Sequence, residues 1–584
     1  MELVRKLVRR TGWNGRTAAL VAVVLAFLVF FLLVPLASVF RLSLWDAQGF
    51  TLHYLQNALA STAIREGIVN AALLAVATTL ASILLALPLA YVNVRSEFLG
   101  KRWLSPLLLA PMILPPFVGA IGMRQLLGPY GVLNALLTEL RLVSPEAHVD
   151  WFGLHPFAGV VFLQTLHLYP IIYLNVVASL ANVDPSLEDA ARNAGASPWT
   201  LFRRITLPLA WPGVFAGAIL VFLWAFTDLG TPLMFNYREV ISVNIFYSIN
   251  ESGSPDANAL VVILLVMVAV IYYLAKLLVG RKGHEMMARS VQTPKGRKLS
   301  LRGTLLVYLA FGTVIVLAAL PHVMVILTSF AGQWNDTILP TALTTAHHAE
   351  ALKHSLTLPS IGNSLIYSLA ATAICIVLAI WVAYVLVRKS FLGRTMLDAM
   401  VMLPLAVPGL VLAFGFLNCY HGLGQTLVRW GLWRENYLYP ETNPVLLLIV
   451  AYAVRRLPYM VRSAVAGFEQ TSRTLEEAAL NVGATPLKTV TRITVPLVMA
   501  NIIAGSILVF TFSMLEVSDS LVLAKDKPFY PLTKAIYSIF SDDYNASRDA
   551  MASALGVWAM VLLAVALIAS TRLLGRKMGA IFRA

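Results

Sequence analysis

Twelve long apolar runs constrain what this chain can fold into more than any other feature of its sequence. A helix needs roughly 20 apolar residues to cross about 30 Å of hydrocarbon, and each run reaches that length. A membrane β-barrel would show short alternating segments instead, so the runs predict an all-α polytopic membrane protein. Because 59% of the residues are hydrophobic and 12% are charged, too few polar side chains remain to cover a water-facing surface. The runs lie near residues 18–40, 66–94, 103–127, 156–181, 207–235, 257–280, 303–329, 361–387, 396–418, 443–467, 496–522 and 551–572.

The positions of Lys and Arg predict how the chain is oriented. If the N-terminus is cytoplasmic, inner segments carry 28 of these residues and outer segments carry 12, so both termini are predicted in the cytoplasm. The net charge of +15 is therefore explained by the basic residues of the inner segments and not by nucleic-acid binding.

The first run lacks a small-residue cleavage site, which favours a retained anchor over a cleaved signal peptide. Cys375 and Cys419 support neither a disulfide framework nor a Cys metal site.

The sequence is internally duplicated. YVNVRSEFLGKRWL from Tyr91 aligns with YVLVRKSFLGRTML from Tyr384 at an offset of 293, and after the outer loop that follows the third span the offset becomes 288. Each half has six predicted spans, and because that number is even, the two halves share one orientation across the membrane. We therefore predict a first repeat at 1–280, a cytoplasmic basic linker at 281–302 and a second repeat at 303–584.

The closest internal match is a polar loop in each half, at 184–206 and 472–494. LEDAARNAGASPWTLFRRITLPL starts at Leu187 and LEEAALNVGATPLKTVTRITVPL at Leu475, with 13 of 23 positions identical. Capping-box pairs predict where a helix starts, glycines predict where it stops, and Ser-Pro or Thr-Pro predicts the start of a second helix. The residues concerned are Ser186 with Asp189 and Thr474 with Glu477, Gly195 and Gly483, and Ser197-Pro198 and Thr485-Pro486.

These loops carry a family resemblance. The pattern E-A-A, three residues, G, about nine residues, I-x-L-P resembles the signature of the permease subunits of binding-protein-dependent ABC importers. The first copy has Asp189 where the second has Glu477, and the second has Val495 where Leu is usual. The resemblance implies a type I importer permease fold in which the short helix of each loop couples to an ATPase. The implied docking residues are Glu188, Asp189, Ala190, Ala191, Gly195, Glu476, Glu477, Ala478, Ala479 and Gly483.

The resemblance also implies partners. No G-x-x-x-x-G-K-[ST] phosphate loop occurs in the chain, so ATP and magnesium are expected on a separate ATPase, and this chain is expected to be no enzyme and to bind no cofactor of its own. Two loops on one chain imply two ATPase copies docked on a fused permease. An extracytoplasmic binding protein would deliver the substrate, and the chain would lie in the bacterial cytoplasmic membrane.

Charged residues inside the spans are the candidate pathway residues, since a charge in hydrocarbon is costly. Arg455 and Arg456 lie in the tenth span, with Asp228 and Glu516 in or near the fifth and eleventh. One interpretation is that the arginines line a substrate cavity with the acids balancing them, and the other is an internal ion pair or an arginine reaching the interface. Prolines within the apolar runs predict kinked or broken helices; they are Pro111, Pro115, Pro116, Pro170, Pro404, Pro408 and Pro458.

The substrate is only implied by resemblance. A fused chain of twelve spans with two such loops is similar to the ferric iron, thiamine and aminoethylphosphonate importers, and ferric iron is the preferred expectation. The two arginines keep a phosphonate or phosphate ester as an alternative. A secondary transporter is the competing class, but it would have no need of paired ATPase-docking loops.

Overall fold

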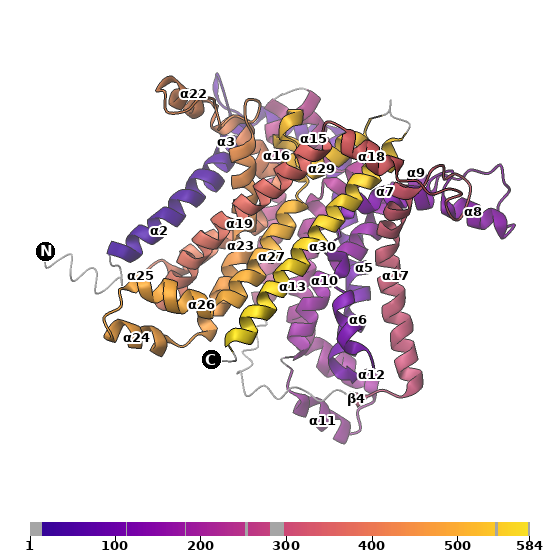
Figure 1. Ribbon diagram of the computed structural model, residues 1–584, viewed down its shortest axis with the longest axis horizontal. Helices are drawn as coiled ribbons and strands as arrows, with labels where there is room; N and C mark the ends of the chain where they lie inside the picture. The colour runs from indigo at the N-terminus through magenta and orange to yellow at the C-terminus, as the bar shows by residue number, and fades with distance from the viewer. Residues whose placement is uncertain are drawn as a thin grey trace.

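In the computed structural model, which describes residues 15–112, 114–181, 183–251, 255–280, 297–542 and 547–581, the chain is built from helices (Figure 1). The described strands are two-residue pairs. β1 (Trp45–Asp46) pairs antiparallel with β2 (Gly49–Phe50), and β3 (Ser96–Glu97) pairs parallel with β4 (Arg297–Lys298).

The helices of the first half are α2 (Gly15–Leu28), η1 (Val29–Leu33), α3 (Val34–Leu44), α4 (His53–Ala60), α5 (Thr62–Arg95), α6 (Lys101–Leu107), η2 (Ala110–Met112), α7 (Pro116–Leu127), α8 (Val132–Glu139), α9 (Trp151–Leu154), α10 (Pro156–Ala181), α11 (Pro185–Asn193), α12 (Pro198–Leu201), η3 (Phe202–Thr206), α13 (Leu207–Thr227), α14 (Gly230–Met234), α15 (Ile241–Glu251) and α16 (Pro255–Gly280). Those of the second half are α17 (Leu301–Phe330), α18 (Ala346–Lys353), α19 (Thr357–Arg388), α20 (Arg394–Met402), η4 (Leu403–Ala406), α21 (Gly409–Cys419), α22 (His421–Arg429), α23 (Val445–Gln470), α24 (Arg473–Asn481), α25 (Pro486–Thr489), η5 (Val490–Thr494), α26 (Val495–Leu497), α27 (Met499–Met514), α28 (Ser518–Leu523), η6 (Lys527–Phe529), α29 (Leu532–Phe540) and α30 (Arg548–Ile581).

The span inventory confirms a polytopic helical protein. Within the described residues, eight helices are long and apolar enough to cross a membrane, and three bent helix pairs raise this number to 11. The predicted tenth span, α23, is not among them, because every 18-residue stretch of it contains Arg455, Arg456 and Arg462. With α23 included, the helices match the twelve predicted runs.

The third and ninth spans are broken, as the prolines within these two runs predict. Lys101–Met112 and Pro116–Glu139 meet at 92°, and Arg394–Ala406 and Gly409–Cys419 meet at 98°. Prolines cause both breaks, because proline fixes φ and donates no backbone hydrogen bond. Pro170 and Pro458 differ, since α10 and α23 continue through them.

The two halves interlock through their first spans. α2 and α3 pack on α19 and α21 of the second half, while α17 packs on α5, α7 and α10 of the first. Two hydrogen bonds join the halves. The Tyr308 hydroxyl on α17 donates to the Leu99 carbonyl oxygen at 2.6 Å, and the Tyr420 hydroxyl donates to the Phe30 carbonyl oxygen. Residues 281–296 of the predicted linker lie outside the described residues.

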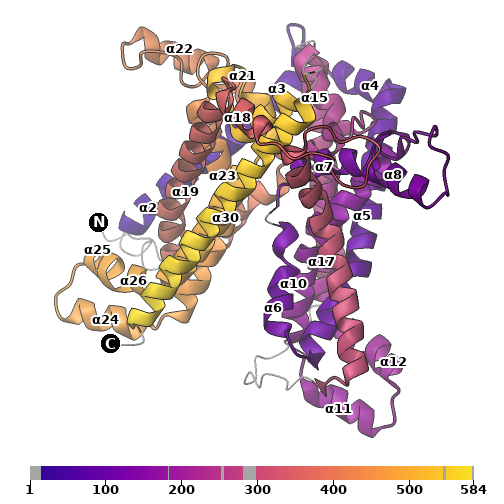
Figure 2. The same ribbon diagram turned by 45° about the vertical axis from the view of Figure 1, so that its right-hand side comes forward.

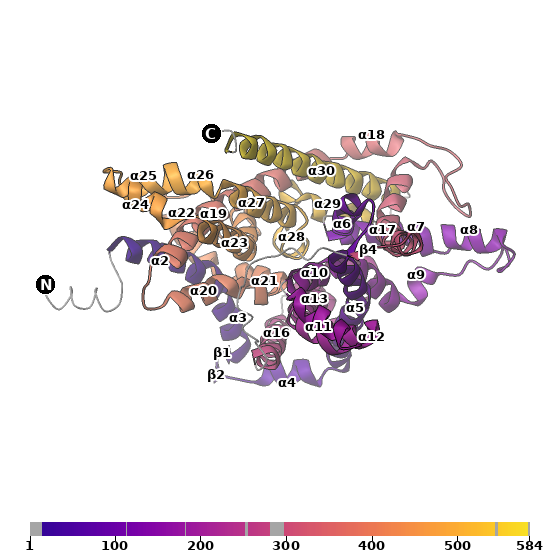
Figure 3. The ribbon, with the colours of Figure 1, turned by 90° about the horizontal axis from the view of Figure 1, so that it is seen from below.

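The ends of the helices define two faces. α11, α12, α24 and α25 lie at one end of the molecule, and α8, α15, α18, α22 and α29 lie at the other (Figure 1). Figure 2 shows two groups of helices that diverge towards the end carrying α11 and α24, with α5, α10 and α17 in one group and α2, α19 and α23 in the other. Figure 3, viewed from that end, shows α11 and α24 well apart. α29 lies at the second end, with its apolar residues Ala535, Ile536 and Ile539 buried against the protein.

Candidate functional site

The repeated loops fold as two short helices joined by a turn, as predicted. Their first helices start earlier than the predicted capping boxes. The Asp184 side chain accepts a hydrogen bond from Ser186 N at 2.9 Å, and the Ser472 hydroxyl accepts one from Thr474 N at 3.2 Å. The prediction that Ser186 and Thr474 cap these helices is therefore wrong, because each lies inside the first turn. The same bond from Ser186 lowers the pKa of Asp184 below its ordinary value.

Glycine makes the turn in both loops. Gly195 has φ +84° and Gly483 has φ +91°, a left-handed conformation that residues with a Cβ rarely adopt. An added Cβ would meet no described heavy atom within 4 Å at either position, so the constraint is conformational and not steric. The second helix starts as predicted, with Ser197 accepting from Thr200 N at 3.2 Å and Thr485 accepting from Lys488 N at 3.3 Å.

Two of the predicted docking carboxylates face the protein. Glu188 Oε1 lies 2.8 Å from Arg95 Nη2 and accepts from the Thr206 hydroxyl at 3.0 Å. Its equivalent, Glu476 Oε1, lies 2.9 Å from Arg388 Nε and accepts from the Thr494 hydroxyl at 3.1 Å. A buried carboxylate requires local partners, and both glutamates find them inside the permease. Their part in a docking surface stays a prediction.

The remaining motif residues are available on the surface. Asp189, Ala190 and Gly195 are exposed in the first loop, as are Glu477, Ala478 and Gly483 in the second, while Ala191 and Ala479 are half-buried. Large apolar side chains project beside them, at equivalent positions in the two loops. These are Leu187 and Leu475, and Trp199 and Leu487, which are 46%, 48%, 67% and 74% exposed. Paired exposed apolar groups on a polar helix–turn–helix suit a protein partner.

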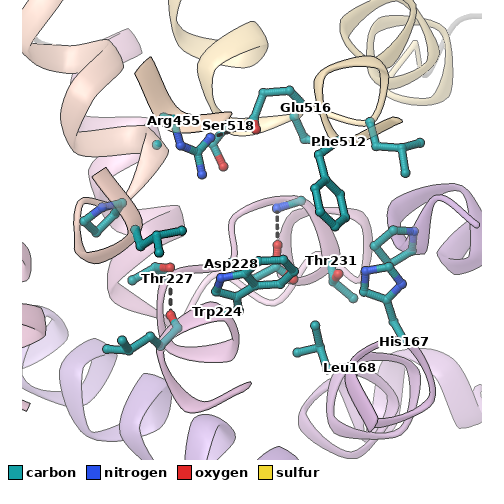
Figure 4. Close-up of a pocket in the computed structure, with 18 of the residues that line it drawn as sticks. His167, Leu168, Trp224, Thr227, Asp228, Thr231, Arg455, Phe512, Glu516 and Ser518 are labelled. Carbon is teal, nitrogen blue, oxygen red and sulfur yellow. Dashed lines mark hydrogen bonds and ion pairs between the residues drawn. The ribbon is translucent and has the colours of Figure 1, made fainter. Parts of the chain in front are cut away.

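A cavity of about 190 Å³ lies between the two halves (Figure 4). The first half contributes Gln164, His167 and Asp228 to its lining, and the second contributes Arg455, Arg456 and Glu516. His167 and Arg455 occupy equivalent positions of the duplication, as do Asp228 and Glu516. All four predicted pathway residues therefore line one cavity.

The second half carries a buried ion cluster on this wall. Arg455 Nη1 lies 2.6 Å from Glu516 Oε1 and 3.0 Å from Asp519 Oδ2, and Arg456 also pairs with Glu516. The arginines form internal ion pairs and also line the cavity, and their contact with substrate stays a prediction. Asp519 was missed by sequence reasoning, although its position one helical turn after Glu516 was the available signal.

Asp228 does not join this cluster. Its carboxylate accepts from Gln164 Nε2 at 2.9 Å and from Gly230 N at 3.1 Å, and Gln164 in turn accepts from the Thr78 hydroxyl at 3.1 Å. On the facing wall, the Asp228 carboxylate is therefore held by uncharged hydrogen-bond donors. Among the described residues, no three His, Cys, Asp or Glu side chains form a group that could hold a metal ion.

Comparison with known proteins identifies the family. The model of the binding-protein-dependent transport system inner membrane component matches residues 79–282 and 375–580, one copy in each half. A putative ferric transport system permease protein of Haemophilus influenzae is 24% identical over 87% of this chain and 77% of its own. A probable ABC transporter permease protein of Sinorhizobium fredii is 26% identical over 94% of each chain. A probable molybdenum ABC transporter permease protein of Haloferax volcanii is 31% identical over 44% of this chain and 87% of its own. This chain therefore belongs to the family of binding-protein-dependent transport system inner membrane components, the membrane-spanning permease subunits of ABC importers.

Proposed function

We propose that this chain is a complete translocation unit that docks two copies of a separate ATPase, one on α11 and one on α24. The observation that carries the proposal is the repetition of the same exposed surface, turn and buried anchor in both halves, at the same end of the molecule. Asp189 and Glu477, with the alanines beside them and the exposed leucines, form the docking surfaces. ATP and magnesium bind to the partner, since this sequence contains no phosphate loop.

The proposed orientation places both loops and both termini in the cytoplasm. The excess of Lys and Arg in the segments that the sequence predicts to be inner supports it. An extracytoplasmic binding protein would deliver substrate to the opposite face, and alternating access through the central cavity would carry the substrate inward.

Ferric iron is the proposed substrate. Permeases whose names give ferric transport are similar over most of this chain, in Haemophilus influenzae and in Actinobacillus pleuropneumoniae. The earlier alternatives, a phosphonate or phosphate ester and thiamine, have no relative among those compared above. An oxyanion such as molybdate is the second candidate, because molybdenum permeases reach 31% identity with part of the chain.

Reconstitution tests this function. The chain would be placed in proteoliposomes with its ATPase, and candidate binding proteins loaded with ferric iron, molybdate or a phosphonate would be added outside. Stimulated ATP hydrolysis together with uptake of one substrate identifies that substrate. Uptake driven by a proton gradient without ATP would instead place the chain among secondary transporters.

A further inference from the structure

A second cavity, of about 630 Å³, lies at the end of the molecule opposite α11 and α24. The first half contributes residues around α7, α9, α14 and α15, and the second half contributes residues of α29 and the start of α30. Its volume falls within the range of roughly 300–1,000 Å³ that is typical of small-molecule sites. We call it the outer cavity.

Three arginines line the outer cavity, namely Arg124, Arg238 and Arg548. The Arg124 guanidinium lies 5.5 Å from the ring centre of Phe540, and that of Arg238 lies 4.9 Å from the ring centre of Tyr247. A guanidinium stacked on a ring keeps its N–H edge for a planar oxyanion, which it can bind through two parallel hydrogen bonds. The aromatic rings therefore contact two of these groups without neutralising them, and Arg238 Nε also donates to Asn236 Oδ1 at 3.1 Å.

Among the described lining residues, three are arginines and one is acidic. Asp150 is the acidic side chain among the lining residues, and its carboxylate accepts from Gly153 N at 2.7 Å. Asp549 Oδ1 lies 3.6 Å from Arg124 Nη1 and 3.7 Å from Arg548 Nε. One carboxylate oxygen is thus shared between two guanidinium groups at long distance. At the position equivalent to Arg124, the second half has Leu417, so the duplicated packing does not require an arginine there.

The outer cavity is also next to the central one. α14 lines both, with Gly230 and Thr231 on the central cavity and Leu233 and Met234 on the outer one. One helix of five residues thus separates them. A ligand bound by the arginines would lie directly outside the central cavity.

We propose that the outer cavity is a binding site for a small oxyanion ligand, recognised through its carboxylate or phosphate oxygens by Arg124 and Arg238. The proposal rests on the proposed import function and narrows its substrate, because the guanidinium groups of Arg124 and Arg238 repel a bare cation. A metal substrate would pass the outer cavity as a negatively charged complex. An oxyanion substrate would pass it as the free anion.

Direct titration of the purified chain in lipid nanodiscs, without ATPase or binding protein, tests the site. Citrate and inorganic phosphate would be titrated separately at constant ionic strength, which distinguishes a carboxylate ligand from a phosphate-like one. We expect saturable binding of at least one of them. Arg238→Gln and Arg124→Gln should each weaken that binding by about tenfold, the loss of a charge-assisted pair. Arg429→Gln, an exposed arginine of α22 outside the cavity, is the matched control and should bind as the unaltered chain does.

Two results would overturn the site. The first is an absence of saturable binding of either ligand, and the second is weakening by Arg429→Gln equal to that by Arg124→Gln and Arg238→Gln. The titration uses no ATP, so an absence of ligand binding to the outer cavity would not affect the result of the ATP-driven import assay in proteoliposomes. An absence of import would likewise not affect the measured ligand binding.

Discussion

Arg388 and Glu476 join the end of a membrane span to the base of a coupling loop, with Nε and Oε1 2.9 Å apart and both side chains almost fully buried. Arg95 and Glu188 repeat this relationship in the first half at 2.8 Å. In each half a threonine from the π-helical turn after the loop donates to the same carboxylate oxygen. The glutamate thus ties the loop to α5 or α19 and to the start of the following span, so that these three elements form one unit.

The first prediction concerns this anchor. Arg388→Gln leaves the Glu476 carboxylate buried without its cation, which costs about 3 kcal/mol of stability, and we expect less substrate imported per ATP hydrolysed. Arg388→Gln combined with Glu476→Gln should recover most of the stability, since no unpaired charge remains, but not the coupling ratio. Thermal unfolding in nanodiscs and the ratio of uptake to hydrolysis measure the two effects. Glu477→Gln, the exposed neighbour, should leave stability unchanged; a loss there equal to that of Arg388→Gln would contradict the inward role of Glu476.

The second prediction concerns the turns. Gly195→Val and Gly483→Val place a β-branched residue at φ +84° and +91°, which costs on the order of 1–3 kcal/mol locally and misplaces the docking helix. We expect ATP hydrolysis to become independent of the loaded binding protein while the chain stays folded in the membrane. Gly422→Val is the control, because that glycine also has open space around its Cβ position but no positive φ. Normal uptake in both loop variants would refute the coupling assignment.

The third prediction concerns the cavity arginines. Arg455→Ala with Arg456→Ala should abolish uptake while the ATPase still assembles on the loops. Because this pair leaves Glu516 and Asp519 buried without cations, a compensated variant, Arg455→Met with Asp519→Asn, separates stability from transport. If Arg455 lines the pathway, the compensated variant folds but its uptake stays impaired. Restored uptake in radiolabel assays would assign the cluster to structure alone.

The fourth prediction uses the space beside Arg455. An added Cβ at Gly409 would lie 2.6 Å from Arg455 Cζ and in contact with Nη1, so Gly409→Ala must move the guanidinium away from Glu516 and Asp519. Uptake should fall several-fold with little loss of protein in the membrane. Gly362→Ala on α19 meets no described atom within 4 Å and should behave as the unaltered chain. Equal uptake in the two variants would show that the position of Arg455 does not matter.

Local chemistry explains what could be predicted. The runs of apolar residues predicted the helices, the repeated prolines predicted the broken third and ninth spans, and the glycines predicted the turns with positive φ. Each of these depends on residues close together in the chain. The helix starts were misplaced by two residues because Asp184 and Ser472 cap as well as the predicted serine and threonine do. Asp519 was overlooked because its role depends on Arg455 in another span.

The sequence by itself determined a duplicated helical membrane protein with two equivalent loops, since periodicity, prolines and glycines act locally. Only the tertiary structure decided which of two adjacent acids faces inward. Glu476 and Glu477 are chemically alike, but packing brings Arg388, 88 residues away, to the first and leaves the second in solvent. Tertiary structure likewise placed Arg455 and Asp228 on opposite walls of one cavity and gathered three arginines at the outer end. Such pairings depend on how the helices pack. A buried charge is stabilised by an opposite charge that is close in space, which can be far away in the sequence.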